Sequence, residues 1–66
     1  MKITVNGQVR EFPPDESLNT LSKRFCKDPR HVLAELNGTI IDHQIWERTF
    51  LCDGDKLELV SFVGGG

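Results

Sequence analysis

Two Asn-Gly pairs, at positions 6–7 and 37–38, constrain the fold of this chain more than any other feature. Each pair stands between short segments that contain apolar, strand-forming residues. A two-residue type I′ turn needs a positive φ angle at both central residues, and Asn-Gly meets that need best. The pairs therefore predict two β-hairpins, over residues 2–12 and over residues 31–41, the second with a very short return strand.

Between the two predicted hairpins, the spacing of apolar residues changes from that of a strand to that of a helix. Leu18, Leu21 and Phe25 fall on one helical face, which we expect to pack on the sheet. Ser17 is a suitable N-cap, and Asp28-Pro29 ends the segment because the residue before a proline is pushed out of the α region. The pattern predicts one helix of about ten residues.

The last third of the chain contains a long connection and a final strand. Residues 42–53 are too apolar for a solvated loop, so we expect a short helical turn and a packed irregular stretch, with Trp46 as a core or rim anchor. Asp53-Gly54-Asp55 predicts a tight turn, and residues 56–63 predict a strand. The order of elements is typical of an α+β fold, with one helix on one face of a sheet of four to five strands.

Sixty-six residues make one small domain, which buries only about 60% of the surface of its unfolded chain. Such a chain has too few residues to enclose an internal catalytic cleft. We therefore expect its chemistry at a terminus, on the surface or in a partner. The net charge of −2 argues against a nucleic-acid partner. Residues 31–66 hold two basic and six acidic side chains, which suits a partner with a basic surface or simply solvates the domain.

The remaining polar residues suggest no catalytic or metal site. Cys26 and Cys52 belong to no metal-binding spacing, and His31 and His43 are isolated, so we expect free thiols and satisfied histidines. The dipole at the end of the predicted helix raises the pKa expected for Cys26. The basic residues between 23 and 30 are expected to solvate the helix end rather than bind phosphate. We find no apolar run long enough for a membrane span and expect a cytoplasmic protein.

The chain ends in Gly64, Gly65 and Gly66. Glycine has no Cβ, so such a tail fits a channel too narrow for other residues and presents the Gly66 carboxylate without hindrance. A plain flexible end is the other interpretation. We expect a domain over residues 1–63 and a flexible tail over residues 64–66.

Alternation along the final strand predicts which side chains face a partner. Leu57 and Leu59 share one face, which we expect to point at the helix, whereas Glu58, Val60 and Phe62 share the other. Val60 and Phe62 are thus expected on the outer face just before the tail, where an apolar pair is typical of a docking surface. The alternative is that strand twist lets the long connection cover Phe62.

Several of these features occur together in one known family. The turn at residues 36–38, the isolated Trp46, the run from Leu51 to Val60 around Asp-Gly-Asp, and the closing Val63-Gly64-Gly65-Gly66 resemble the ThiS family of sulfur carriers of thiamine biosynthesis. The resemblance covers the whole chain and implies a ubiquitin-like β-grasp fold with a mixed sheet. The family's minimum tail is two glycines, so Gly64 is expected to be a spacer.

The resemblance also implies a function. A ThiF-like adenylating enzyme that uses ATP and Mg would activate the Gly66 carboxylate, and a persulfide protein would convert it to a thiocarboxylate. A ThiG-like thiazole synthase would then take the sulfur. The chain itself would be a co-substrate rather than an enzyme, with no cofactor bound. Two alternatives stay open, namely a MoaD-like sulfur carrier for molybdopterin and a ubiquitin-like modifier conjugated through Gly66.

Overall fold

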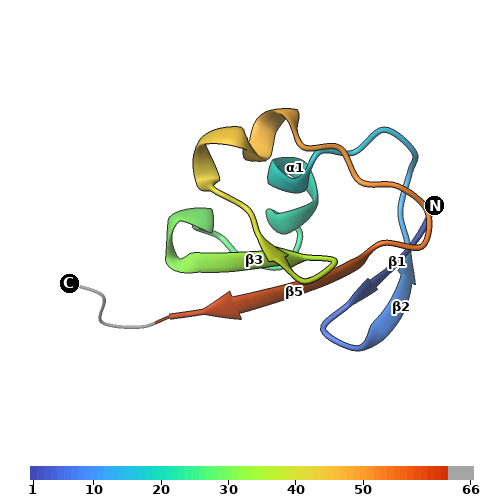
Figure 1. Ribbon diagram of the computed structural model, residues 1–66, viewed down its shortest axis with the longest axis horizontal. Coiled ribbons are helices and arrows are strands. Elements are labelled where there is room, and N and C mark those ends of the chain that lie inside the picture. Colours follow the sequence, from blue (N-terminus) through green and yellow to red (C-terminus); the bar gives the residue numbers. More distant parts are fainter. Residues whose placement is uncertain (63–66) are drawn as a thin grey trace.

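The computed structural model describes residues 1–62 as a five-stranded sheet with its helices on one side (Figure 1). The elements, in chain order, are β1 (Lys2–Val5), β2 (Gln8–Glu11), α1 (Leu18–Ser22), the 3-10 helix η1 (Pro29–His31), β3 (Val32–Leu36), β4 (Thr39–Ile40), the 3-10 helix η2 (His43–Arg48) and β5 (Lys56–Ser61). The α+β class and the helix on one face are confirmed.

The sheet has the strand order β2-β1-β5-β3-β4, so the last strand of the chain lies at its centre. β5 pairs parallel with β1 and antiparallel with β3, while β1–β2 and β3–β4 are antiparallel hairpins. The sheet is therefore mixed, as the family resemblance implies. A parallel pair needs a crossover connection, and residues 6–55 supply it by way of α1 and the second hairpin.

Both Asn-Gly pairs form the turns that the sequence predicts. The φ angles are 49° and 83° at Asn6 and Gly7, and 51° and 87° at Asn37 and Gly38. These values lie in the left-handed region that a type I′ turn requires and that asparagine and glycine tolerate. The return strand β4 has only two residues, as expected.

The expected length of the helix is wrong. Ser17 is the N-cap and accepts a hydrogen bond from the Thr20 amide, but α1 ends at Ser22 after five residues. Beyond it, the amides of Arg24 and Phe25 bond to carbonyls three residues back, which tightens the chain into turns. Arg24 also folds back to form an ion pair with the Glu16 carboxylate instead of lying beside a helix terminus.

Phe25 accordingly lies at the rim rather than on the core face expected for it. Its side chain is 39% exposed and meets Phe12 edge to face, with 6.1 Å between ring centroids. The Arg10 guanidinium lies 5.4 Å from the Phe25 ring centroid, within the range of a cation–π contact. The shortened helix turns the ring away from the interior because the i, i+7 spacing holds only while the helix continues.

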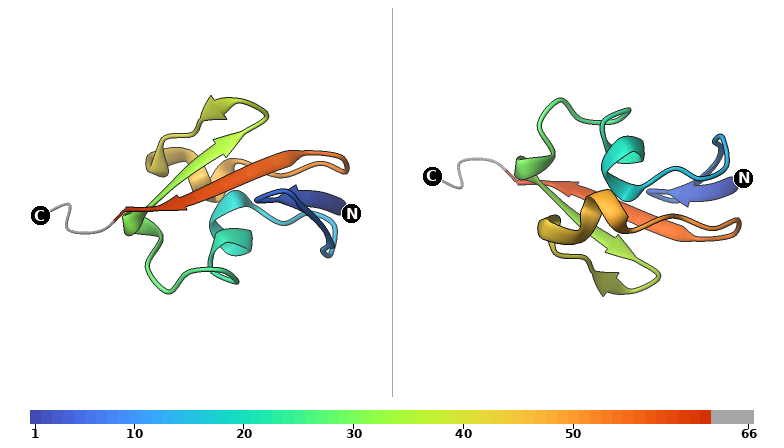
Figure 2. Two further views of the ribbon diagram at one scale, coloured as in Figure 1. Left: turned by 90° about the horizontal axis from the view of Figure 1, so that it is seen from below. Right: turned by 90° about the horizontal axis from the view of Figure 1, so that it is seen from above.

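The core lies between the sheet and the layer formed by α1 and η2 (Figure 1), and Figure 2 shows the molecule from the sheet side and from the helix side. Its buried apolar side chains are Ile3, Val5, Phe12, Leu18, Leu21, Val32, Ala34, Trp46, Leu51 and Leu57. Trp46 is the largest of the fully buried side chains, and its indole N–H donates to the Ile41 carbonyl at 2.9 Å. The interpretation of Trp46 as a core anchor of the long connection is confirmed.

The rest of that connection also follows the prediction. η2 is the short helical turn, and an isolated bridge between Ser17 and Phe50 holds the irregular stretch against the start of α1. The tight turn at Asp53-Gly54-Asp55 places Gly54 at a φ of 90°. The two aspartates of this turn form hydrogen bonds to neighbouring backbone. The Asp53 carboxylate accepts from the Lys2 amide, and the Asp55 carboxylate accepts from the Cys52 amide.

Candidate functional site at the end of the last strand

β5 is positioned by the two turn asparagines as well as by its neighbouring strands. The Asn37 side-chain oxygen accepts from the Lys56 amide at 2.9 Å, and the Asn6 side-chain oxygen accepts from the Leu59 amide at 2.8 Å. The Asn37 side-chain amide also donates to Asp55. Each asparagine thus sets a turn and holds the central strand, a second role that the Asn-Gly signal does not reveal.

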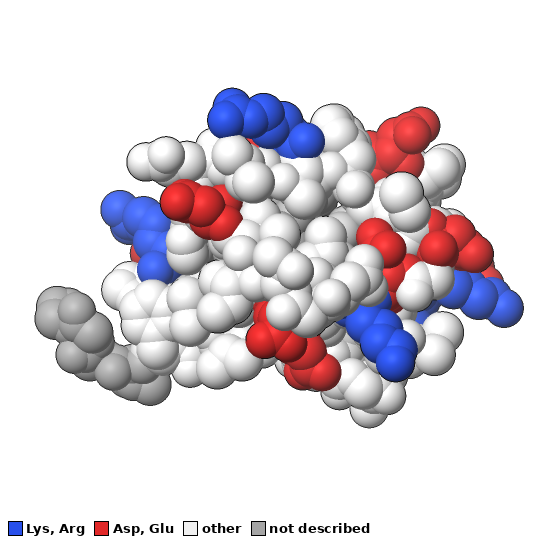
Figure 3. All heavy atoms as spheres, viewed as in Figure 1, with Lys and Arg blue, Asp and Glu red and all other residues white. Residues whose placement is uncertain are grey.

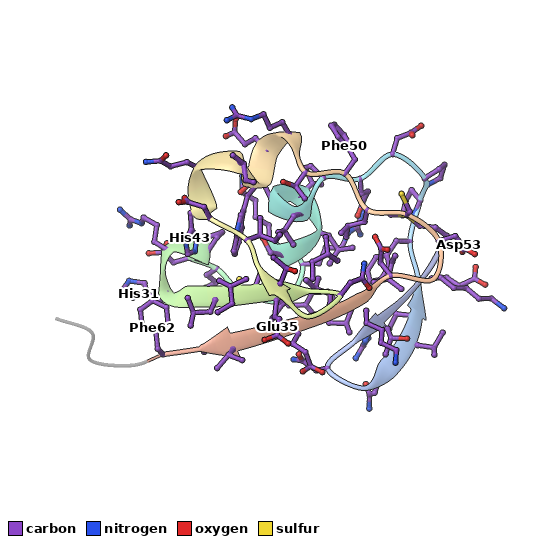
Figure 4. The ribbon with its side chains drawn as sticks, viewed as in Figure 1. His31, Glu35, His43, Phe50, Asp53 and Phe62 are labelled. Atoms are coloured by element: carbon purple, nitrogen blue, oxygen red, sulfur yellow. The ribbon has the colours of Figure 1, made fainter. Side chains whose placement is uncertain are left out.

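The carboxyl-terminal end of β5 is anchored to η1. The Phe62 amide donates to the His31 carbonyl at 3.0 Å, and the two aromatic rings tilt toward each other with centroids 6.3 Å apart. Figure 4 shows the two side chains together at this end of the molecule. His31 therefore fixes the point from which the chain leaves the sheet, a contact that sequence reasoning missed because the two residues lie far apart in the chain.

Asp28 contacts both η1 and the His31 ring. Its carboxylate caps η1 by accepting from the Arg30 amide at 3.1 Å, forms an ion pair with the Arg30 guanidinium and lies 3.4 Å from the His31 ring. The hydrogen bonds from Arg30 are the main reason that the pKa of Asp28 falls to about 2. Asp28 therefore stays ionised at neutral pH and holds η1 in its present form.

The side chains of β5 alternate as predicted. Leu57 is buried and Leu59 packs against the core, whereas Val60 is 56% exposed and Phe62 is 38% exposed. The long connection leaves Phe62 in contact with solvent, so the alternative in which it is covered does not describe this structure. The role of Val60 and Phe62 in partner binding stays a prediction. Gly64, Gly65 and Gly66, together with Val63, lie outside the described residues.

The other sequence candidates have structural roles. The His43 ring stacks on Trp46 at 4.3 Å between centroids, and its Nε2 lies 2.8 Å from the Pro29 carbonyl oxygen and 2.7 Å from that of Val32. Since carbonyls only accept, Nε2 carries the proton and donates between them. No group of three or more ligand-type side chains gathers anywhere in residues 1–62 to hold a metal ion.

The two cysteines are free thiols, as expected. Burial raises the pKa of the Cys26 thiol, and the nearby Asp28 carboxylate raises it further. The expected direction is right, but burial rather than a helix dipole is the main cause. Cys52 is exposed next to the Asp53–Asp55 turn.

Figure 3 shows a broad uncharged area at the centre of one face, with acidic and basic side chains around its edge. The basic residues between 23 and 30 are partly neutralised, since Arg24 pairs with Glu16 and Arg30 pairs with Asp28. These ion pairs support the interpretation that the basic residues between 23 and 30 form a solvated surface rather than a phosphate-binding site. The end of β5, with its exposed apolar pair, is the best candidate for a functional site in the described residues.

Comparison with known proteins identifies the family. The model of the ThiS family matches residues 3–66, which is nearly the whole chain and includes the glycine tail. This chain belongs to the ThiS family. It is 31% identical over 65 residues to the sulfur carrier protein ThiS of Bacillus subtilis, covering 97% of this chain and 98% of that protein.

A solved structure agrees with the ThiS assignment. The crystal structure of a thiamine biosynthesis protein (ThiS) from Geobacter metallireducens superposes with a TM-score of 0.84 at 30% identity, covering both chains fully. This match confirms the ubiquitin-like fold expected for the family.

A third ThiS-like sequence occurs inside a larger protein. The chain is 36% identical over 66 residues to a thiazole synthase of Paramagnetospirillum magneticum, and it spans only 20% of that protein's length.

None of the helices in residues 1–62 has the length and apolar character required to cross a bilayer.

Proposed function

We propose that this chain is the sulfur carrier of a thiazole-forming step in thiamine biosynthesis, with the Gly66 carboxylate as its reactive group. The observation that carries the proposal is the ThiS family match through residue 66, combined with a central strand that runs toward the glycine tail. The exposed pair Val60 and Phe62 supports it, because an apolar surface beside a reactive terminus is suited to a partner enzyme.

The proposed chemistry begins with activation by a ThiF-like enzyme that supplies ATP and Mg. A carboxylate is a poor acceptor for sulfur, so the Gly66 carboxylate first attacks the α-phosphorus of ATP and releases pyrophosphate. A sulfur nucleophile then attacks the acyl carbon and expels AMP. When the nucleophile is a protein persulfide, a thiol reduces the resulting acyl disulfide and leaves the Gly66 thiocarboxylate. The carrier contributes presentation, while the enzyme contributes charge stabilisation.

The final acceptor in this proposal is a ThiG-like thiazole synthase. Support comes from the Paramagnetospirillum magneticum thiazole synthase, which contains a segment similar to this entire chain. Two proteins that meet repeatedly gain effective concentration when they are joined, so such a fusion fits a carrier and its acceptor. The two free thiols fit a carrier that works in a reducing cytoplasm.

Intact-mass spectrometry tests the proposal directly. The purified chain is incubated with ATP, Mg, the ThiF-type enzyme of the same organism and a sulfur source. The expected product is heavier by the difference between sulfur and oxygen. A covalent protein adduct instead indicates a modifier, and delivery of sulfur to a molybdopterin precursor but not to a thiazole synthase indicates the MoaD-like alternative.

Matched variants locate the reaction at the terminus. Deleting Gly66, or adding one residue after it, is expected to leave folding unchanged and to abolish thiocarboxylate formation, since misplacing a reacting atom by about 1 Å costs roughly 100-fold in rate. Gly65→Ala is expected to weaken adenylation at an unchanged melting temperature if the tail enters a narrow channel. An extended chain that gains sulfur without being trimmed overturns the proposal.

A further inference from the structure

The open face of the sheet carries two carboxylates placed directly opposite each other. Glu35 of β3 and Glu58 of β5 are register partners in the antiparallel pair, and both are exposed. Side chains so placed have Cβ atoms about 5 Å apart, and like charges at that separation destabilise a sheet. In Figure 4 the Glu35 side chain points away from the helical layer.

This repulsion is not relieved within the described chain. The ion pairs of residues 1–62 are Arg24–Glu16 and Arg30–Asp28, the His31 ring also lies beside Asp28, and none of these contacts involves Glu35 or Glu58. Lys56 lies two residues before Glu58 on the same strand and forms no ion pair with it. The centre of the sheet thus keeps an unfavourable charge pair that a single amide substitution would remove.

Apolar side chains surround the two carboxylates. Leu33 and Val60 are also register partners, in the next position on this face, and Ile40 of β4 is opposite Glu35. Leu33 is 42% exposed and Ile40 is 62% exposed. The view onto this side in Figure 2 (left) looks directly at β5, with α1 and η2 behind the strands. We call the set Leu33, Glu35, Ile40, Glu58 and Val60 the acidic–apolar face.

The charge decides what this face can bind. A second copy related by a two-fold axis would bring two such acidic pairs together, which electrostatics opposes. Lys2 and Lys56 lie toward the β1 side of this face, so the repulsion of nucleic acid and anionic lipid is local to the Glu35–Glu58 pair. The matching surface is an arginine or lysine set among apolar side chains of a protein, because it covers the leucine, isoleucine and valine and neutralises the opposed carboxylates.

We propose that the acidic–apolar face receives a basic side chain of the adenylating enzyme, an inference that rests on the function proposed above. An enzyme that binds ATP needs positive charge around the phosphates, and an acidic carrier is drawn toward such a site. Glu58 lies eight positions before Gly66, so a fully extended chain places the two at most about 27 Å apart. A nucleotide site within that distance of the docked Glu58 is therefore within reach of the Gly66 carboxylate.

The test compares Glu35→Gln and Glu58→Gln, singly and together, with Glu47→Gln as the control. Glu47 is an exposed carboxylate on η2 in the helical layer, so the control removes the same charge from another surface. Binding of each chain to the ThiF-type enzyme is measured by calorimetry at several salt concentrations, and the melting temperature is measured in parallel.

We expect the double variant to bind at least tenfold more weakly, with a smaller salt dependence, and to melt at the same or a higher temperature because the repulsion is gone. The control is expected to bind like the wild type. Unchanged binding of the double variant overturns the inference, as does a fall in melting temperature that accounts for the lost binding. If the wild type is not adenylated at all, the proposed function fails first, and the inference fails with it.

Discussion

At the scale of single residues, each of the two turn asparagines has two structural roles. Asn37 adopts a left-handed φ angle and its side chain makes two hydrogen bonds, one to the Lys56 amide and one to Asp55. Asn6 does the same for the Leu59 amide from the other side of β5. Turn geometry and strand alignment therefore depend on the same side chains.

Substitutions at Asn37 separate these two contributions. Asn37→Gly keeps the favourable backbone and removes only the side-chain bonds, so we expect a loss of about 1 kcal/mol in the free energy of unfolding. Asn37→Ala also strains the left-handed position, and we expect a loss of about 2 kcal/mol. Urea denaturation of both variants measures the difference. Equal losses would show that the backbone angle contributes nothing.

At the scale of elements, η1 is a short helix whose form depends on one carboxylate. Asp28 caps it and has a pKa of about 2, below the ordinary value. A depressed carboxyl pKa contributes stability above the unfolded-state pKa of about 4 and loses it as the pH falls toward the folded-state value.

We therefore expect Asp28→Ala to lower the melting temperature at neutral pH. The difference from the wild type should stay constant down to about pH 4 and shrink between about pH 4 and pH 2 as the carboxyl becomes protonated. Thermal unfolding followed by circular dichroism across this range measures it. A difference that persists unchanged at pH 2 would mean that the charge of Asp28 is not what stabilises η1.

The elements also show where sequence reasoning succeeds. The hairpins, the last strand and its alternating faces follow from local rules, since Asn-Gly fixes the turn and a period of two fixes the faces. The length of α1 depended instead on a tertiary contact, because Arg24 turns back to Glu16 and Phe25 meets Phe12. The anchoring of Phe62 by His31 joins residues far apart in the chain, and no local pattern encodes it.

At the scale of the whole molecule, the surface around the end of β5 is expected to bind the adenylating enzyme. Phe62→Ser, alone and with Val60→Ser, should leave the chain folded and weaken binding at least tenfold, since both side chains are substantially exposed. Phe50→Ser is the matched control, because Phe50 is an exposed aromatic residue beside Ser17 at the start of α1, far from Phe62 in Figure 4. Thermal unfolding and calorimetric titration provide the two measurements.

The size of the stability change determines how this experiment is interpreted. Removing a core aromatic costs about 3–5 kcal/mol. A loss of that size in Phe62→Ser would place the ring inside the fold and exclude it as a docking residue. Equal loss of binding in Phe50→Ser would show that any exposed aromatic residue of the domain matters, and the end of β5 would lose its special role.

The parallel pairing of the first and last strands has a mechanical consequence. Thr4 and Val5 of β1 align with Lys56 and Leu57 of β5, and the chain enters β1 and leaves β5 at opposite ends of the molecule (Figure 1). Tension applied between the two termini therefore acts along both strands in opposite senses and loads their hydrogen bonds together, instead of peeling them apart one by one. A pull on the carboxyl-terminal end while the amino-terminal end is held therefore loads the β1–β5 pair in shear.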